Sequence, residues 1–91
     1  MGAMANFAGG SAWAMARDVG AGHVLVTLRT FAAYNPVQLG QIAFELDRHL
    51  REVRADQPPL DDQKAQQFRH RKISRLNSAL IILRNVRQRR G

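Results

Sequence analysis

The spacing of apolar residues predicts helices along most of the chain, most clearly in the segment after Asn35. Asn35 is a favourable N-cap, and Pro36 stands at the first helical position, where its missing N–H costs no hydrogen bond. Pro58 and Pro59 cannot continue a helix, so the pattern predicts a helix over about residues 36–56. The apolar residues of this segment form one stripe, made of Leu39, Ile42, Ala43, Leu46, Leu50 and Val53.

A second long helix is predicted over about residues 61–87. Asp61 or Asp62 can cap it, because a negative charge is favourable at the positive end of the helix dipole. The short proline-containing connection predicts that the helices over 36–56 and 61–87 pack as an antiparallel hairpin. One hairpin cannot bury both apolar faces, so residues 11–34 or a second copy must complete the core. The apolar face of this helix holds Ala65, Phe68, Leu76, Ala79, Leu80, Leu83 and Val86.

The first 34 residues carry weaker signals. Residues 1–10 are small and glycine-rich, which predicts a flexible tail, and the first three resemble a cloning remnant. Ser11 can cap a short helix over 11–19, whose Trp13 and Met15 are expected to pack in the core. Residues 24–27 are typical of a strand, whereas Val24, Leu28, Phe31 and Ala32 recur at helical spacing. No second β-rich segment can pair with a strand here, so 23–34 is predicted as a helix. We therefore expect an all-α fold in one domain over 11–91: a helical hairpin with N-terminal helices, forming a dimeric bundle.

The charge of the chain is concentrated near its C-terminus. Residues 1–60 contain five arginines and five acidic residues, which cancel, whereas residues 61–91 contain nine basic and two acidic residues. The whole formal charge of +7 (nine minus two) therefore belongs to the second predicted helix and its tail. This segregation is typical of a polyanion-binding element joined to a neutral scaffold.

Polar and basic residues line the face of this helix that lies opposite its apolar stripe. The row is about 37 Å long at 1.5 Å per residue, and no acidic residue follows Asp62. Arginine donates paired hydrogen bonds to phosphate oxygens, and serine and asparagine can reach phosphate or sugar oxygens. A solvated face that keeps a small protein soluble is the alternative interpretation. The predicted nucleic-acid-binding residues are Lys64, Gln67, Arg71, Ser74, Arg75, Ser78, Asn85 and Arg89.

Catalytic and metal sites are not predicted. His23, His49 and His70 stand far apart without a repeated carboxylate spacing, and the absence of cysteine excludes disulfides and thiolate zinc sites. A chain of 91 residues also has too small a core for a deep catalytic pocket. We expect no enzyme, no cofactor, no metal and no small-molecule substrate. The uncharged stretch over 1–16 is broken by two glycines, so neither a signal peptide nor a membrane partner is expected.

The motifs and residue types that are missing from the polar row indicate which type of nucleic acid it binds. A helix-turn-helix motif needs a short recognition helix after a tight turn, whereas here a proline pair precedes a helix of about seven turns. Aromatic residues that stack on single-stranded bases are missing, because Phe68 falls on the apolar side. A face of this kind favours a duplex recognised by shape, as RNA duplexes largely are.

The second helix and the turn before it resemble the nodavirus RNA-silencing suppressors over about residues 37–83. The resemblance lies in the run His70-Arg71-Lys72-Ile73-Ser74-Arg75-Leu76-Asn77-Ser78-Ala79-Leu80-Ile81 and in the turn Asp56-Gln57-Pro58-Pro59. It implies a homodimeric four-helix bundle that binds double-stranded RNA independently of sequence in the host cytoplasm and shields it from Dicer and from small-RNA loading. It also implies that Arg75 is the key phosphate contact, with Arg71 and Ser74 beside it. This chain departs from the family in its N-terminal extension and in a shorter start to the second helix.

Two other functions remain open at this point. One is a DNA-binding regulator or partition protein of a phage, plasmid or bacterium, which the basic charge equally permits. The other is a protein-interaction module whose basic helix binds an acidic partner. Ile81 and Ile82 widen the apolar surface of the helix, as expected if it also contacts another subunit.

Overall fold

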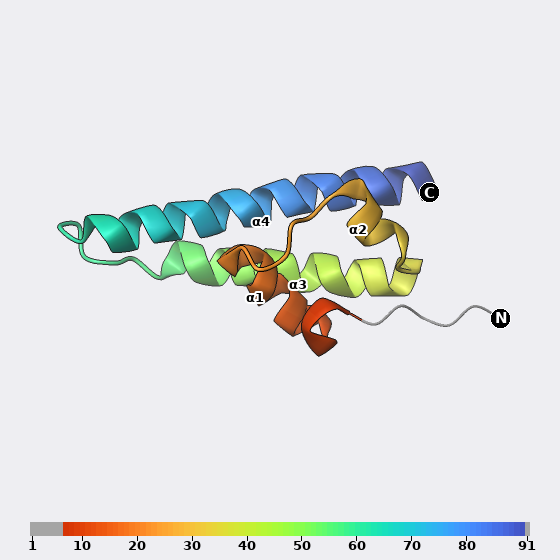
Figure 1. Ribbon diagram of the computed structural model, residues 1–91, viewed down its shortest axis with the longest axis horizontal. Helices are drawn as coiled ribbons and strands as arrows, with labels where there is room; N and C mark the ends of the chain where they lie inside the picture. The colour runs from red at the N-terminus through yellow and green to blue at the C-terminus, as the bar shows by residue number, and fades with distance from the viewer. Residues whose placement is uncertain (1–6, 91) are drawn as a thin grey trace.

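The computed structural model describes residues 7–90 and is an elongated helical body of 54 × 24 × 19 Å (Figure 1). Its elements are the 3-10 turn η1 (Ala8–Gly10) and the helices α1 (Ala12–Ala21), α2 (Leu28–Ala32), α3 (Pro36–Ala55) and α4 (Gln63–Arg90). Because residues 7–90 contain no strand, the all-α prediction is confirmed.

The two long helices begin at the capping residues that the sequence indicates. At the start of α3, the Gln38 N–H donates to Asn35 Oδ1 (2.8 Å) and the Asn35 N–H donates to Gln38 Oε1 (3.0 Å). At the start of α4, the Ala65 N–H donates to Asp62 Oδ1 (3.0 Å). The two helices pack side by side and run in opposite directions (Figure 1), so the residue 56–62 connection lies at one end of the molecule.

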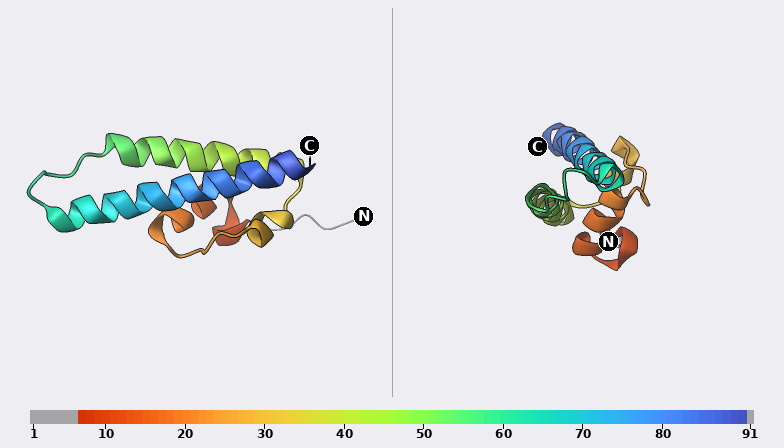
Figure 2. Two further views of the ribbon diagram at one scale, coloured as in Figure 1. Left: turned by 90° about the horizontal axis from the view of Figure 1, so that it is seen from above. Right: turned by 90° about the vertical axis from the view of Figure 1, so that its left-hand side faces the viewer.

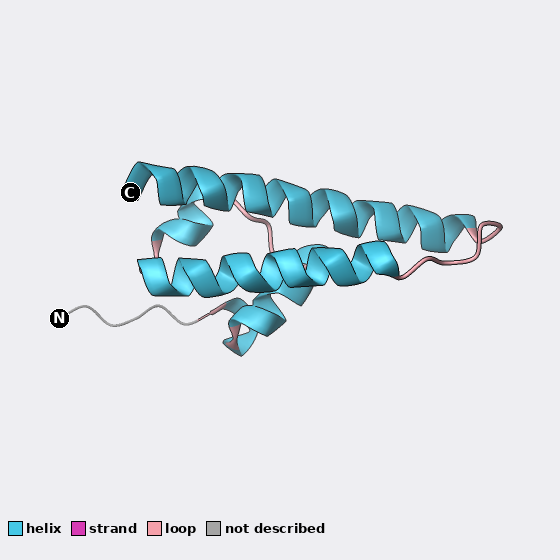
Figure 3. Cartoon of the chain, turned by 180° about the vertical axis from the view of Figure 1, so that it is seen from behind, coloured by secondary structure: helices cyan, strands magenta, loops and turns pink. Residues whose placement is uncertain are grey.

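The N-terminal third of the same chain completes the core. The helix α1 packs on both α3 and α4, and α2 packs on α4. Both short helices lie on one side of the α3–α4 pair, as Figures 2 and 3 show. Met15 and Phe31 are fully buried there. The remaining buried apolar residues are Ala16, Val19, Tyr34, Leu39, Ile42, Leu46, Leu50, Val53, Leu76, Ala79, Leu83 and Val86.

The predicted helix over 23–34 is wrong for its first half. Gly22 ends α1 in the left-handed conformation (φ 83°), and only Leu28–Ala32 is helical in this segment. Residues 23–27, which we call the strap, run along α4 without regular structure. Val24 and Val26 pack on the core and Leu25 points to solvent, so this strand-like segment is extended and buried on one side without pairing with another strand.

The N-terminal segment differs from its prediction in two places. Phe7 stacks on Tyr34 with ring centroids 5.6 Å apart, and the Ala8 N–H donates to the Tyr34 hydroxyl (3.3 Å), so residues 7–10 pack on the domain. The rest of the flexible tail predicted for residues 1–10, with the cloning remnant predicted for its first three residues, lies outside the described residues. Met15 is buried as predicted, whereas Trp13 is 48% exposed. No helix within residues 7–90 is apolar over a length that could cross a membrane.

Candidate nucleic-acid-binding face

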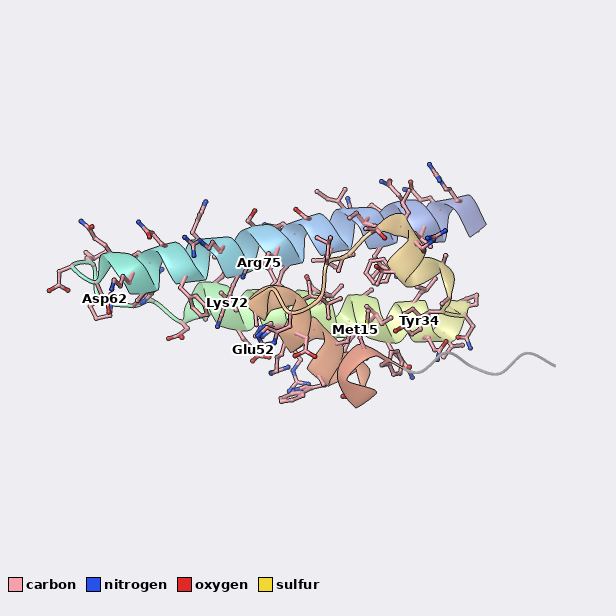
Figure 4. All side chains as sticks on the ribbon, in the orientation of Figure 1. Met15, Tyr34, Glu52, Asp62, Lys72 and Arg75 are labelled. Atoms are coloured by element: carbon pink, nitrogen blue, oxygen red, sulfur yellow. The ribbon has the colours of Figure 1, made fainter. Side chains whose placement is uncertain are left out.

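The predicted polar row lies on the solvent side of α4. Seven of its eight residues are exposed, and Arg75 is half-buried. The stick view in Figure 4 shows many polar side chains extending from α4 away from α3. Since α4 contains no acidic residue, the row presents only cations, amides and hydroxyls. The large apolar side chains that the described part of α4 exposes are Ile81 (57%) and Phe68 (50%). The exposed row residues are Lys64, Gln67, Arg71, Ser74, Ser78, Asn85 and Arg89.

Acidic side chains on the other elements are paired with bases close to them in the fold. Glu52 accepts from Arg17 (3.1 Å) and also lies 3.7 Å from Arg48. Asp47 pairs with Arg51. Among residues 7–89, every ion pair joins groups of α1, α3 and His23, and none includes a cation of α4. The positive charge of α4 is therefore not neutralised by carboxylates within this part of the chain.

Arg75 has a structural partner. Its Nη1 donates to the Gly20 carbonyl at 3.1 Å, across 55 residues of sequence. Gly20 lies in the last turn of α1, where carbonyl groups lack partners within the helix. A Cβ on Gly22 would lie 2.7 Å from Arg75 Cζ, so Gly22 both ends α1 and leaves room for the guanidinium. The resemblance assigned Arg75 to phosphate, but part of its hydrogen-bonding capacity holds α1 on α4.

Arg69 makes the equivalent contact at the end of α3. Its Nε and Nη2 donate to the carbonyls of Val53 (3.2 Å) and Arg54 (2.8 Å). Lys72 lies 4.6 Å from the centre of the Phe68 ring. The basic residues of α4 therefore divide into structural cations and cations that face solvent. The helical phase places Arg69 beside the apolar stripe and could have indicated its role, whereas the partner of Arg75 depends on where α1 packs.

The strap and α2 lie along one side of the polar row. The strap residues Val24 and Val26 form a hollow of about 240 Å³ with Ser74, Arg75 and Ser78, among other residues. Further along, α2 and the end of α4 line a second hollow of about 390 Å³, made of Leu28, Arg29, Ala32, Val86 and Arg89.

This arrangement adds one cation that the sequence did not single out. Arg29 is exposed and lines the same hollow as Arg89. In the sequence, Arg29 is one of five arginines that five acidic residues balance within residues 1–60, so it did not stand out. The packing of α2 on α4 brings it beside the row. His70 and Gln88 are also exposed on α4.

His49 has a shifted pKa, and it lies apart from the polar row. Burial lowers the pKa of His49 below its usual value of 6.5, and the nearby Arg17 guanidinium lowers it further. Its Nδ1 is buried without a hydrogen-bond partner among the described residues. Within residues 7–90 no three acidic or histidine side chains come close enough together to hold a metal ion. The polar row of α4 is therefore the surface whose chemistry best indicates a function.

Comparisons with protein-family models, with curated proteins and with solved structures gave no match. The resemblance over residues 37–83 stays a prediction. A function must therefore be argued from the charge, exposure and contacts of α4.

Proposed function

We propose that this protein binds double-stranded RNA, without sequence preference, along the exposed face of α4. The observation that carries the proposal is the separation of charge in the folded chain. The carboxylates of α3 are paired with arginines of α1 and α3. Lys64, Arg71 and Arg89, by contrast, face solvent along a helix that has no acid. Such a surface attracts a polyanion and releases the counterions condensed on it.

The length of the face supports a duplex rather than an isolated anion. Lys64 and Arg89 are separated by about 37 Å along the helix, and a duplex presents a phosphate charge about every 1.7 Å of its axis. One side of a duplex therefore offers several phosphates to the whole row. Arg29 and Arg89, which line one hollow, give two cations at the α2 end of the row.

The groups between the cations favour RNA over DNA. Ser74, Ser78 and Asn85 are exposed hydroxyl and amide groups that can bond a 2′-hydroxyl as well as a phosphate. The row holds no aromatic residue that could stack on an unpaired base. In the family that the sequence resembles, binding of this kind shields the duplex from Dicer and from small-RNA loading, and we propose the same consequence for this chain.

A second candidate is a protein partner with an acidic, partly apolar surface. The observation in its favour is Ile81, which is 57% exposed and lies among the polar residues of the row. Ile81→Ser distinguishes the two functions, because it would leave the affinity for duplex RNA within about twofold. A protein partner that buries Ile81 would instead lose about tenfold or more in affinity.

The experiment that tests the proposal is a competition at fixed salt. A labelled RNA duplex bound to the full chain is displaced by unlabelled duplex RNA, duplex DNA or single-stranded RNA of the same length. We expect duplex RNA to compete at least about tenfold better than the other two, because only it combines the duplex shape with 2′-hydroxyls. Equal competition by duplex DNA would contradict the choice of RNA and favour the DNA-binding alternative. Equal competition by single strands would contradict duplex recognition altogether.

A further inference from the structure

An apolar hollow lies between α3 and the start of α1, away from the polar row. Its volume is about 610 Å³. Three of its large side chains are unusually exposed for apolar residues: Trp13 (48%), Val37 (68%) and Phe44 (60%). Glu45 is the one charged residue that lines it. The complete lining is Phe7, Ser11, Ala12, Trp13, Val37, Gly40, Gln41, Phe44 and Glu45.

The hollow exists because α3 carries a second apolar stripe. Leu39, Ile42 and Leu46 form the buried stripe that faces the core. Val37, Gly40 and Phe44 follow at intervals of three and four residues on the outer side of the helix, where the described residues leave them open. A contiguous exposed apolar patch of this kind marks an interaction surface more often than a scattered single residue does.

Gly40 gives independent evidence that something packs closely on this stripe. A glycine inside a helix destabilises it by about 1 kcal/mol relative to alanine. The other glycine within an α-helix has a reason within the chain, since a Cβ on Gly20 would lie 3.3 Å from His49 Nε2. A Cβ on Gly40 would meet no described atom within 4 Å. Nothing in the described chain therefore requires glycine here, whereas a second backbone approaching α3 would.

We propose that this hollow is the interface between two copies of the chain, with α3 packed on α3 of the partner across a two-fold axis near Gly40. A two-fold interface requires one patch that fits itself, with a protruding and a receding part. This patch has both: Phe44 protrudes, and Gly40 lies one helical turn away with open space above it. In the dimer, Phe44 of each copy packs over Gly40 of the other.

The charges also favour a second copy over other occupants. The lining holds no cation that would attract nucleic acid or anionic lipid. All residues of the hollow belong to residues 1–60, in which arginines and acidic residues are equal in number. Two copies can therefore meet at the hollow without bringing the cations of their α4 helices together. Glu45 lies beside Arg48 (3.7 Å), so both signs are available to face the partner.

The dimer would place two polar rows outward. In the end-on view of Figure 2, α4 and the start of α1 lie at opposite edges of the molecule. Copies joined through the hollow therefore present their α4 faces away from each other. This consequence, that one dimer holds two duplexes, rests on the function proposed above, whereas the dimer itself does not.

Sedimentation of the full chain without nucleic acid tests the dimer. We expect a concentration-dependent dimer, accompanied by a blue shift in the emission of Trp13, the one tryptophan of the chain. Gly40→Gln fills the space at the axis without a clash inside its own chain, so it should raise the dissociation constant at least about a hundredfold, because the obstruction occurs twice. At concentrations where the wild type is also monomeric, its helicity and Tm should stay equal to the wild type or rise, which separates loss of the dimer from loss of the fold.

Two controls make the outcome decisive. Phe44→Ala should weaken the dimer, whereas Phe68→Ala, which removes a similarly exposed ring (50%) outside the hollow, should not. A wild-type chain that remains monomeric at every accessible concentration would overturn the proposal. A Gly40→Gln dimer as tight as the wild type would do the same, since the interface would then lie elsewhere. Duplex binding by the Gly40→Gln monomer is measured separately and reports on α4 alone.

Discussion

Replacing Arg75 tests whether this arginine holds the fold together before it contacts any ligand. In Arg75→Ala, the Gly20 carbonyl loses its charged donor at the end of α1. A hydrogen bond to a charged group contributes about 1.5–3 kcal/mol, and partial exposure of Arg75 to solvent reduces this to about 1–2 kcal/mol. For a domain of this size, about 1 kcal/mol corresponds to roughly 4–8 °C, so the Tm should fall by about 5–15 °C.

The matched control for this measurement is Arg71→Ala. Arg71 lies one turn earlier on α4, is exposed and has no hydrogen bond or ion pair with another described residue, so its loss should change stability by less than about 0.5 kcal/mol. Thermal and urea unfolding followed by circular dichroism measure both variants. Equal stabilities of Arg75→Ala and Arg71→Ala would refute the structural role of Arg75. Weaker RNA binding by Arg75→Ala alone would not establish a phosphate contact, because α1 and the strap also depend on this residue.

Three further outcomes follow from the structure. Arg29→Gln should weaken duplex RNA binding about eightfold at about 0.1 M salt, and a binding isotherm identical to the wild type would remove α2 from the interface. His49 has a lowered pKa in the folded state, so its contribution to stability is present above pH 6.5 and is lost as the pH falls through the folded pKa. In His49→Gln, the free energy of unfolding should therefore vary less with pH over this acid range. An unchanged pH profile would argue against the burial of the neutral imidazole. Gly22→Ala should lower the free energy of unfolding in urea by more than about 1 kcal/mol, because φ is +83° at this position and the added Cβ would meet Arg75. A smaller loss would show that neither the backbone conformation nor the contact with Arg75 requires glycine here.

The parts of the fold that follow from the sequence are those fixed by neighbouring residues. Asn35, Pro36 and Asp62 determine where α3 and α4 begin through hydrogen bonds within a few residues. The core face of α3 likewise follows from a period that needs no knowledge of the partner helix. The all-α class and the exposure of most of the polar row could therefore be predicted.

The remaining features depend on contacts that are distant in sequence. The apolar run over residues 24–26 suits a strand, the edge of a helix or an extended strap, and only the packing of Val24 and Val26 against α4 decides among these. From the sequence alone, Arg75 is predicted to be a surface cation, because its partner, the Gly20 carbonyl, lies beside it only when α1 packs on α4. The exposure of Trp13 and Phe44 likewise depends on how far α1 covers α3.

The central proposal is that the α4 face, rather than the total charge of the chain, binds duplex RNA. The most direct test compares two triple variants that both lower the formal charge from +7 to +4 (seven minus three). One changes Lys64, Arg71 and Arg89 of α4 to glutamine. The other changes Arg48, Arg51 and Arg54 of α3.

Binding of duplex RNA by both variants is measured as a function of salt. Each neutralised phosphate contributes about 0.9 to the slope of log K against log salt, or about eightfold in affinity at 0.1 M. The α4 variant should therefore lose about 500-fold in affinity and about 2.7 in slope. The α3 variant should stay within about threefold of the wild type, because its arginines lie off the face. Equal losses in the two variants would contradict the account, because the binding would then depend on net charge and not on α4.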